Sequence, residues 1–386
     1  MYAKLAADQI FKKLDSIESG SLTIVTPDGK SRTFEGKNTG EHAHMEFKDW
    51  SVVTNLIHKG DIGLAEDYRS GKWDTDNLVG LTTLGLINRS AMDQLIVGHP
   101  LSRTASMLSY LMRLNTLAGS RRNIHAHYDL GNDFYKLWLD PTMTYSAAIY
   151  KNQHESLSEA QHNKYDRIVD CLDAHSGDLL EIGCGWGGFA DRALQRGDYN
   201  IKGITLSDEQ HAYASDRLGQ SAQIALEDYR HQNGKFDSIV SIEMFEAVGE
   251  KYWKTYFEKI AALLKQNGKA VIQTITMNDH DFPRYRKGGD FIRSFIFPGG
   301  MLPSPSRFRA EAQAAGLRCD NPFFFGHDYA RTLEEWLKAF DAHRDQILNM
   351  GYDEGFIRLW RFYLAGCIAG FRANRTDVMQ VELCHA

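Results

Sequence analysis

The chain has no long apolar run. No window of its 386 residues approaches eighteen uncharged apolar residues, and the first ten residues include Lys4 and Asp8 where a secretory signal would have its apolar core. No cleavage pattern follows. We therefore expect neither a membrane span nor a secretory signal.

The chain has few cysteines, and their spacing indicates no pairing. The five cysteines are odd in number, scattered and without a C-x-x-C pair: Cys171, Cys184, Cys319, Cys367 and Cys384. This argues against a disulfide framework or a zinc ribbon, and we expect no metal site. A reducing cytoplasm fits this pattern best.

Neither sign of charge is in large excess. The 44 Lys and Arg residues stand against 50 Asp and Glu, a formal net charge of −6. A mildly acidic chain argues against nucleic acid as a partner, while a local basic patch for lipid phosphates stays compatible with it.

The sequence changes pattern near residue 120. Residues 1–90 mix short elements, including a strand from Ser21 that a Pro-Asp-Gly turn interrupts, which predicts a small α+β domain. The turn-rich basic stretch 119–123 suits a linker. We therefore predict an accessory domain with its linker over 1–120 and a catalytic domain over 121–386.

The second part alternates helical stretches with short apolar runs. These runs, taken as strands, are 178–182, 201–205, 236–242 and 269–275. The alternation is typical of βαβ units and predicts a doubly wound, mostly parallel α/β sheet.

Three helices can be placed by their caps or spacing. A capping pattern at 158–161 opens an amphipathic helix that ends near residue 175, and a similar pattern at 332–335 is expected to cap another. Residues 353–373 carry apolar side chains at helical spacing but also two arginines. This last segment is a packed amphipathic helix and not a membrane span.

A glycine-rich loop follows the first of these strands and opens a helix. It reads Glu181-Ile-Gly183-Cys-Gly185-Trp-Gly187-Gly188. Missing side chains let a ligand approach the backbone, and a helix N-terminus offers free N–H groups, so we predict a nucleotide-like ligand. The spacing also matches the dinucleotide fingerprint, with Asp208 where an NAD enzyme needs its ribose-binding acid. The loop alone leaves both ligands open.

Three further features favour S-adenosylmethionine. Glu181 precedes the first glycine by two residues, where it can orient the loop and the ammonium end of the cofactor. A capped helix precedes the first strand, and the strand at 269–275 follows Asn267-Gly268. These features are typical of a class I, Rossmann-like methyltransferase.

Seven ordered blocks then point to one family. They are Tyr128-Asp-Leu-Gly-Asn-Asp-Phe-Tyr135, Leu139-Asp-Pro-Thr-Met-Thr-Tyr-Ser146, Leu180-Glu-Ile-Gly-Cys-Gly-Trp-Gly-Gly188, Gly203-Ile-Thr-Leu-Ser207 with Gln210, Met244-Phe-Glu-Ala-Val-Gly249, Phe295-Ile-Phe-Pro-Gly-Gly-Met-Leu-Pro-Ser304 and Phe325-Gly-His-Asp-Tyr329. Through these blocks the chain resembles the cyclopropane-fatty-acyl-phospholipid synthase family, which includes the mycolic acid cyclopropane synthases. The run 60–71 resembles the family's accessory domain, which helps to present membrane lipid.

The resemblance implies an activity and a location. It implies methyl transfer from S-adenosylmethionine to the double bond of an unsaturated acyl chain in a membrane phospholipid. The product would be a cyclopropane or a methyl-branched chain. The enzyme would be cytoplasmic and peripheral on the inner membrane face, and a homodimer is left open.

The resemblance also implies the site residues. Tyr145 and Ser146 would hold the methionine end of the cofactor, with Gly183, Gly185 and the neighbouring Gly187 beneath it, Thr205, Leu206 and Gln210 at the ribose, and Asp228 and Tyr229 beside the adenine. Glu246, Tyr329 and the backbone of Ile275 would form part of a bicarbonate site beside the transferred methyl group.

Two residues depart from the family pattern. Ala147 stands where members commonly have Cys after the Tyr-Ser pair, and Gln273 stands where they have His on the strand. The family uses only a backbone N–H at the first position, which alanine supplies. The second change removes an imidazole, which can take up or release a proton, from the place where ring closure requires proton transfer. It therefore bears on ring closure and not on cofactor binding.

The chemistry also needs an aromatic cage and a lipid contact. A methylated alkene becomes carbocation-like, and we expect two or three of seven aromatic residues to shield it: Phe134, Tyr135, Trp138, Tyr145, Phe245, Phe295 and Phe297. The basic loop 281–289, with Arg293 beyond it, is a candidate for meeting phospholipid headgroups.

Two other functions stay open. One is an amine N-methyltransferase, because plant alkaloid N-methyltransferases share this catalytic domain. The other is a non-catalytic lipid-binding protein on a decayed methyltransferase scaffold, for which Ala147 and Gln273 are the motive. The intact glycine loop, Glu246 and Tyr329 argue against the second.

Overall fold

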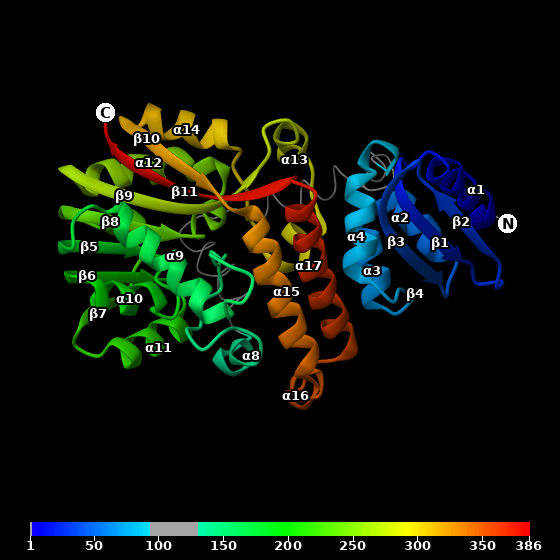
Figure 1. Cartoon of the computed structure of the whole chain (residues 1–386), viewed down its shortest axis with the longest axis horizontal. Coiled ribbons are helices and arrows are strands. Elements are labelled where there is room, and N and C mark those ends of the chain that lie inside the picture. Colours follow the sequence, from blue (N-terminus) through cyan, green and yellow to red (C-terminus); the bar gives the residue numbers. More distant parts are fainter. Residues whose placement is uncertain (1, 93–129) are drawn as a thin grey trace. The chain divides into compact units, whose positions relative to one another are not determined.

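The computed structural model describes residues 2–92 and 130–386, which form two compact units (Figure 1). The N-terminal unit contains the elements up to α4 together with Lys287–Ile296 and Trp336–Arg375. The large unit contains the described part of Arg113–Arg286 with Phe297–Glu335 and Thr376–Ala386. The boundary predicted near residue 120 lies outside the described residues. A division there would place both later segments of the N-terminal unit in the catalytic part.

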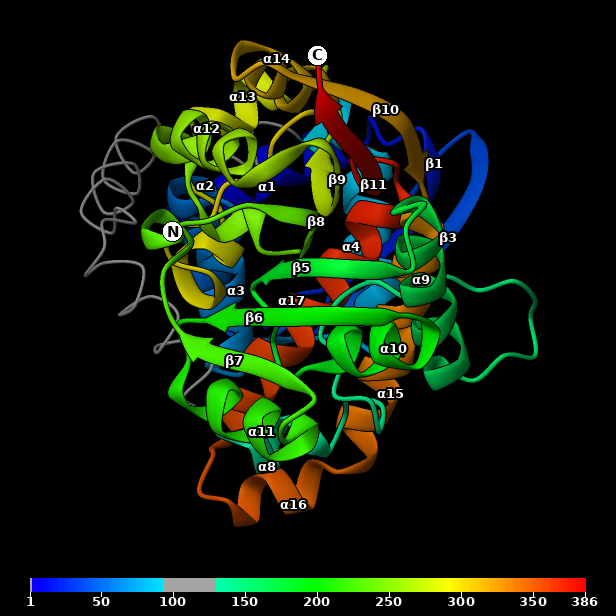
Figure 2. The ribbon, with the colours of Figure 1, turned by 90° about the vertical axis from the view of Figure 1, so that its left-hand side faces the viewer.

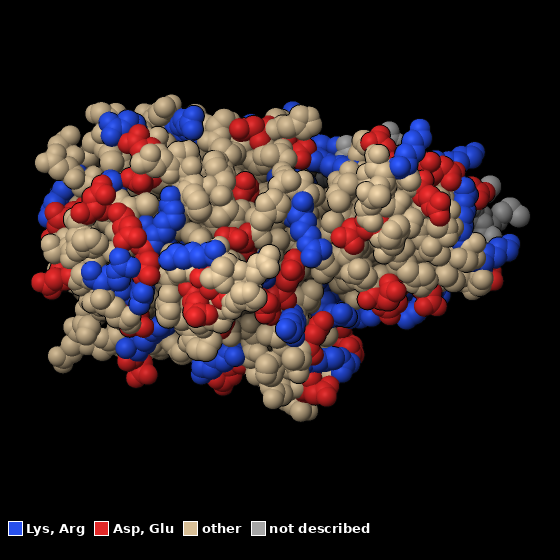
Figure 3. Space-filling view, viewed as in Figure 1, with Lys and Arg blue, Asp and Glu red and all other residues tan. Residues whose placement is uncertain are grey.

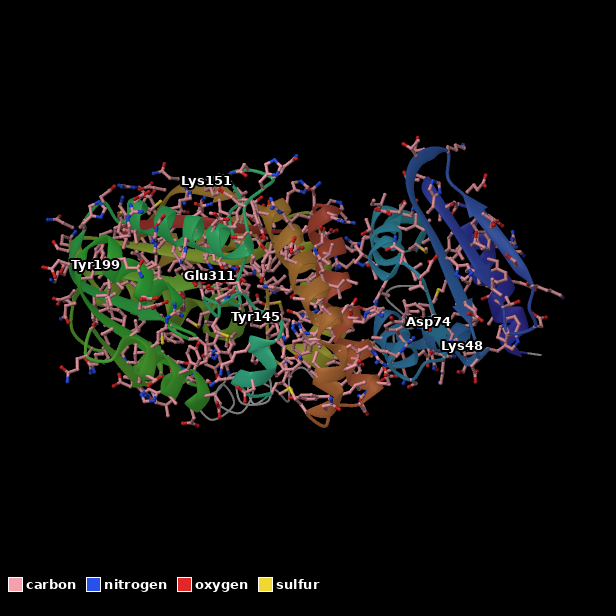
Figure 4. All side chains as sticks on the ribbon, turned by 60° about the horizontal axis from the view of Figure 1, so that its bottom comes forward. Lys48, Asp74, Tyr145, Lys151, Tyr199 and Glu311 are labelled. Carbon is pink, nitrogen blue, oxygen red and sulfur yellow. The ribbon has the colours of Figure 1, made fainter. Side chains whose placement is uncertain are left out.

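The N-terminal unit is built on a four-stranded sheet. Its order is β2-β1-β3-β4, with bounds Ser31–Glu35, Ser19–Val25, Asn38–Phe47 and Trp73–Asp74. The predicted turn joins β1 to β2, since the Thr26 N–H donates to the Lys30 carbonyl at 2.9 Å. Lys48 and Asp74, labelled in Figure 4, form an ion pair at 3.2 Å beside β3 and β4.

Helices complete this unit. They are α1 (Tyr2–Leu14), α2 (Ser51–Lys59), α3 (Asp61–Arg69), α4 (Leu78–Ile87), α16 (Arg344–Asn349) and α17 (Glu354–Arg372), with a π-helix at Ile292–Ile296. The helix predicted over 353–373 is confirmed as α17, whose first turn is capped by the Asp353 side chain. No helix in the described ranges is long and apolar enough to cross a membrane.

The large unit holds a seven-stranded sheet in the order β10-β11-β9-β8-β5-β6-β7. The four predicted strands are confirmed as β5 (Ser176–Ile182), β6 (Asp198–Thr205), β8 (Phe236–Ile242) and β9 (Leu264–Met277). Sequence patterns did not identify β7 (Ala222–Leu226), β10 (Leu317–Phe324) and β11 (Thr376–His385). Strands β7, β6, β5, β8 and β9 are parallel, and β11 pairs antiparallel with both β9 and β10.

Helices cover both faces of this sheet. Helices α9 (Leu157–Cys171), α10 (Gly188–Arg196) and α11 (Asp208–Leu218) lie on one face, and α12 (Trp253–Leu263) and α14 (Pro305–Ala314) lie on the other (Figure 2). The remaining α-helices are α8 (Asn132–Lys136), α13 (Phe282–Arg286) and α15 (Gly326–Ala342), and α15 belongs to the N-terminal unit from Trp336 onward. The predicted doubly wound α/β fold is therefore confirmed.

Two predicted helix caps are wrong. The side chain that caps α9 is Ser156, where the chain is still extended, and it forms a reciprocal capping box with Glu159. Thr332 lies inside α15 instead of at its start. Its hydroxyl donates to the Asp328 carbonyl at 2.8 Å and accepts the Ala148 N–H at 3.2 Å.

The order of the strands fixes where a ligand can bind. From β5 the chain proceeds outward to β6 and β7 on one side, and later to β8 and β9 on the other. The loops after β5 and β8 therefore diverge at the carboxyl edge of the sheet. Such a divergence opens a crevice, which is the usual ligand site of doubly wound sheets.

Candidate active site

A cavity lies at this carboxyl edge of the sheet in the large unit. Its lining includes every predicted cofactor residue except Gly187: Tyr145, Ser146, Glu181, Gly183, Gly185, Thr205, Leu206, Gln210, Asp228 and Tyr229. Tyr145, labelled in Figure 4, packs its ring 5.6 Å from that of Tyr135 in α8. The structure thus brings together residues that are more than eighty positions apart in sequence.

Two glycines of the loop have different roles, one facing the cavity and one allowing close helix packing. Gly185 has a φ of +53°, and a Cβ built there meets no protein atom within 4 Å, so a side chain would enter the cavity. Gly187 has a φ of +81°, and its Cβ would lie 3.1 Å from Leu218 and 3.3 Å from Ala214. Gly187 therefore lets α10 pack closely against α11.

Glu181 supplies a buried acceptor to the cavity. It is 2% exposed, and its Oε2 atom has no hydrogen-bond partner among the described residues. Burial raises the pKa of its carboxyl well above the ordinary value, against the attraction of Lys164 and Arg217. An orphaned carboxylate oxygen in a nucleotide-sized crevice fits the ammonium group of S-adenosylmethionine.

A second group of lining residues suits a nucleoside. The Thr205 hydroxyl donates to Gln210 Oε1 at 2.8 Å, and the Asp228 carboxylate is held by Arg230 at 2.6 Å. Asp208, the acid that an NAD enzyme would use, is the first residue of α11 and is not among the residues that line the cavity. The residues therefore fit S-adenosylmethionine better than a dinucleotide.

Two carboxylates follow β8, and the sequence named only the second. The first, Glu243, accepts the Ala147 N–H and the Gln273 side-chain amide on Oε1, each at 2.8 Å. It accepts the Tyr329 hydroxyl on Oε2 at 2.6 Å. The structure therefore gathers three predicted catalytic residues around Glu243, which also lines the cavity.

Glu246, the predicted acid, has different partners. Its Oε1 accepts the Thr274 hydroxyl at 3.0 Å and the Ile275 N–H, while its buried Oε2 has no partner among the described residues. Burial, with Glu243 nearby, raises the pKa of Glu246 to about 8. Glu246 and Ile275 thus meet as predicted, whereas the Tyr329 hydroxyl donates to the other acid.

Comparison with known proteins places the chain in a family. Residues 116–381 match the family model described as mycolic acid cyclopropane synthetase. The chain belongs to this family. The recognition made from the seven blocks is confirmed, and this member of the synthetase family is an S-adenosylmethionine-dependent methyltransferase.

Relatives match over most of this synthetase-family chain. The tuberculostearic acid methyltransferase of Mycobacterium tuberculosis is 37% identical over 349 residues, covering 86% of this chain and 81% of that protein. The cyclopropane-fatty-acyl-phospholipid synthase of Escherichia coli is 33% identical over 346 residues, covering 89% and 88%. The mycolic acid cyclopropane synthase CmaA1, solved with SAH and CTAB, shares 33% identity with a TM-score of 0.64, covering 68% of this chain and 97% of that one.

A chain of hydrogen bonds fixes the side chain of Gln273 in this synthetase-family member. Arg167 donates to Gln380 Oε1 at 2.6 Å, and Gln380 donates to Gln273 Oε1 at 2.9 Å. The amide NH₂ of Gln273 is therefore turned toward Glu243 as a donor. Strand pairing makes this possible, because Gln380 lies opposite Gln273 between β11 and β9.

Lys164 is a further site residue that the sequence analysis missed. It is fully buried in α9, and its Nζ donates to Ser146 Oγ at 2.6 Å. Burial lowers the pKa of Lys164 to about 7, opposed by Glu243, Asp140 and Glu181. The sequence could have identified it, because Gln161 and Lys164 are polar residues on the buried face of an amphipathic helix.

Several aromatic side chains line the cavity, including one of the seven residues proposed for the cage. Of the seven, Tyr145 lines the cavity, together with Tyr165, Trp186 and Phe189, which the sequence analysis did not name for this role. Phe245 instead packs in the core, with its ring 4.9 Å from Tyr256 and 5.4 Å from Trp253. The hydrophobic requirement of the core accounts for this position of Phe245.

Proposed function

We propose that this enzyme transfers the methyl group of S-adenosylmethionine to the double bond of an unsaturated acyl chain in a membrane phospholipid, giving a cyclopropane or a methyl-branched chain. The observation that carries the proposal is one cavity that holds both an ammonium-binding acid, Glu181, and a carboxylate held by three donors, Glu243. The names of the Escherichia coli and Mycobacterium tuberculosis relatives supply the lipid class.

The residues of the cavity have two tasks, which are to hold the cofactor and to protect a cationic chain from water. When bound, S-adenosylmethionine supplies a methyl group on a positively charged sulfur. Glu181 and the glycine loop hold that end of the cofactor, and Tyr145 lines the same cavity. Apolar and aromatic walls exclude the water that would capture a cationic chain, and ring faces stabilise positive charge.

The test uses vesicles and labelled cofactor. Purified enzyme is incubated with vesicles of a mono-unsaturated phospholipid and S-adenosylmethionine with a trideuterated methyl group, and the released fatty acids are analysed by mass spectrometry. We expect labelled acyl chains, and none from vesicles of a saturated phospholipid. Label found only on an amine headgroup would favour an N-methyltransferase, and release of no S-adenosylhomocysteine would favour a non-catalytic protein.

The number of deuteriums retained identifies the product. Ring closure through the new methyl group discards one deuterium, whereas loss of a chain proton retains all three. Because the amide of Gln273 is fixed as a donor and cannot take a proton, deprotonation of the new methyl group should be slower than with His at this position, and we expect a fraction of the product chains to keep all three. Gln273→His should shift product toward the ring. Exclusive retention of two deuteriums in a saturated ring by the wild type would contradict this expectation.

The basic loop is a weaker lipid contact than its composition indicates. Arg286 pairs with Glu250 at 2.6 Å, and the buried Arg293 pairs with Asp290 at 2.7 Å. On the face that Figure 3 shows, Lys and Arg are interspersed with Asp and Glu over most of the surface. Any contribution to headgroup binding therefore falls mainly on the exposed Lys287.

Neutralising Arg284, Arg286 and Lys287 together should weaken binding to anionic vesicles. A basic residue near such a surface contributes on the order of 1 kcal/mol, and the paired Arg286 less, so we expect roughly a tenfold loss in cosedimentation. A matched control neutralises Lys30, Lys254 and Arg318, which are exposed and lie outside the loop. Equal vesicle binding by the two triple variants would remove the headgroup role from this loop.

A further inference from the structure

Three donors from distant parts of the chain converge on Glu243. They are the Ala147 N–H after the Tyr-Ser pair, the Gln273 amide in β9 and the Tyr329 hydroxyl in α15. Each donor is buried, with Ala147 and Gln273 0% exposed and Tyr329 6% exposed. These are positions that the family resemblance assigned to catalysis around a bicarbonate ion. In this chain they hold a carboxylate of the protein itself.

Bicarbonate does not fit this arrangement. A carboxylate and a bicarbonate ion present the same pair of oxygens to donors, so they compete for one place. The Tyr329 hydroxyl and the Ala147 N–H already donate to Glu243, and the Ile275 N–H donates to Glu246. The donors expected to hold the ion are therefore occupied by two glutamates, and we derive no step through bicarbonate.

The backbone at Glu243 is held in an unusual conformation. Its φ of +49° lies in the left-handed region, which costs a residue with a Cβ on the order of 1 kcal/mol. The conformation is anchored by its N–H, which donates to the Gln273 carbonyl at 2.8 Å. Glycine would adopt this conformation without strain. In this chain Glu243 adopts it, and its carboxylate accepts hydrogen bonds from the three donors.

The surrounding charges favour an ionised Glu243 beside a neutral Glu246. Burial raises the pKa of Glu243 above its ordinary value, and the hydrogen bonds from Tyr329, Ala147 and Gln273, with the charge of Lys164, oppose that rise. Burial and the nearby Glu243 carboxylate raise the pKa of Glu246 to about 8, and its Oε2 has no partner among the described residues, so Glu246 is the acid of the pair that we expect to hold a proton.

We propose that Glu243 is the catalytic base, its carboxylate standing where a bicarbonate ion would otherwise be bound. This inference rests on the proposed methyl transfer to an alkene. The alkene electron pair would form the new bond to the methyl carbon, whose bond to sulfur would break with its electron pair left on sulfur, and the neighbouring chain carbon would become cationic. A C–H bond of the methylated chain then breaks, its electron pair closes a ring or forms a double bond, and its proton goes to Glu243 Oε2, which has a second lone pair beside the Tyr329 bond.

The decisive variant is Glu243→Gly. Glycine adopts the left-handed backbone without strain, removes the carboxylate and leaves the three donors facing an open place. We expect wild-type turnover to be unchanged in buffer freed of carbon dioxide. We expect Glu243→Gly to lose on the order of 100-fold in kcat and to recover roughly tenfold with added bicarbonate or formate. Glu243→Gln fills the same space with an amide, so it should lose activity without recovery.

Two measurements separate a failed fold from a failed proposal. Calorimetric titration with S-adenosylhomocysteine should give both variants an affinity within about threefold of the wild type, since Glu181 and the glycine loop are unchanged. Carbon-13 NMR of labelled bicarbonate should show binding to Glu243→Gly and not to the wild type. Bicarbonate-dependent turnover of the wild type, or a fully active Glu243→Gly without added anion, would overturn the proposal.

The bicarbonate measurement and the lipid assay separate failure of this proposal from failure of the proposed function. A wild type that methylates no unsaturated lipid would refute the proposed function. In that case the bicarbonate binding contrast still tests the place assigned to Glu243, because it needs no lipid. Bicarbonate bound by the wild type as tightly as by Glu243→Gly would refute that assignment alone.

Discussion

Replacing Gly185 with Val should abolish cofactor binding. The valine side chain would project into the cavity where no protein atom lies within 4 Å of its Cβ, and it would occupy space that the cofactor needs. We expect the affinity for S-adenosylhomocysteine, measured by calorimetry, to fall roughly 100-fold or more. The wild type should bind S-adenosylhomocysteine and show no heat with NAD.

Gly219 provides a matched control for this substitution. It has the same φ of +53° and the same open surroundings, but it follows α11 and does not line the cavity. Gly219→Val therefore also introduces a side chain at a positive φ, but without blocking the ligand. We expect similar losses of thermal stability in the two variants and near-normal binding in Gly219→Val alone. Equal binding by both would show that Gly185 does not face the cofactor.

Replacing Glu246 with Gln should stabilise the protein at alkaline pH. A carboxyl whose folded pKa is raised binds its proton more tightly in the folded chain than in the unfolded one. Between the ordinary value of 4.5 and the folded value of about 8, the free energy of unfolding therefore falls as pH rises. At pH 8.5 this cost is on the order of a few kcal/mol, and an amide avoids it.

Urea unfolding at pH 5 and pH 8.5 measures the effect. Gln can keep the acceptor oxygen that meets Thr274 and Ile275, so we expect little difference from the wild type at pH 5 and a more stable variant at pH 8.5. Glu258→Gln is the control, since Glu258 is exposed and pairs loosely with Lys254 at 3.7 Å. A difference between wild type and Glu246→Gln that does not change with pH would contradict the assignment.

The sequence was most informative where local chemistry decides the structure. The four central strands, the glycine loop and Glu181 follow from alternating patterns, from missing side chains and from an acid at the end of a strand. The cavity gathers nearly all of the predicted cofactor residues because parallel strands bring their carboxyl ends to one edge.

The base could not be chosen from sequence because the choice depends on long-range register. Glu243 and Glu246 both follow β8, and only the pairing of Ile242 with Gln273 places the amide beside the first of them. The amide orientation depends in turn on β11, which comes from the end of the printed sequence and pairs with β9. No local pattern carries that information.

The division into units escaped the sequence for a similar reason. Segments 287–296 and 336–375 follow the catalytic strands in the chain but pack with the N-terminal elements. Within that unit, Arg358 of α17 donates to the Trp73 carbonyl at 2.7 Å, and Thr82 of α4 donates to the Ala365 carbonyl at 3.1 Å. Composition near residue 120 marks a change of pattern but not the later return of the chain.

The left-handed backbone at Glu243 has a consequence for how such enzymes diverge. Codons for glutamate and glycine differ by a single nucleotide, and glycine is the residue that this backbone tolerates best. One mutation would therefore relax the chain and vacate the donors together. A single mutation in either direction can thus exchange the glutamate base for bicarbonate, which forms from dissolved carbon dioxide.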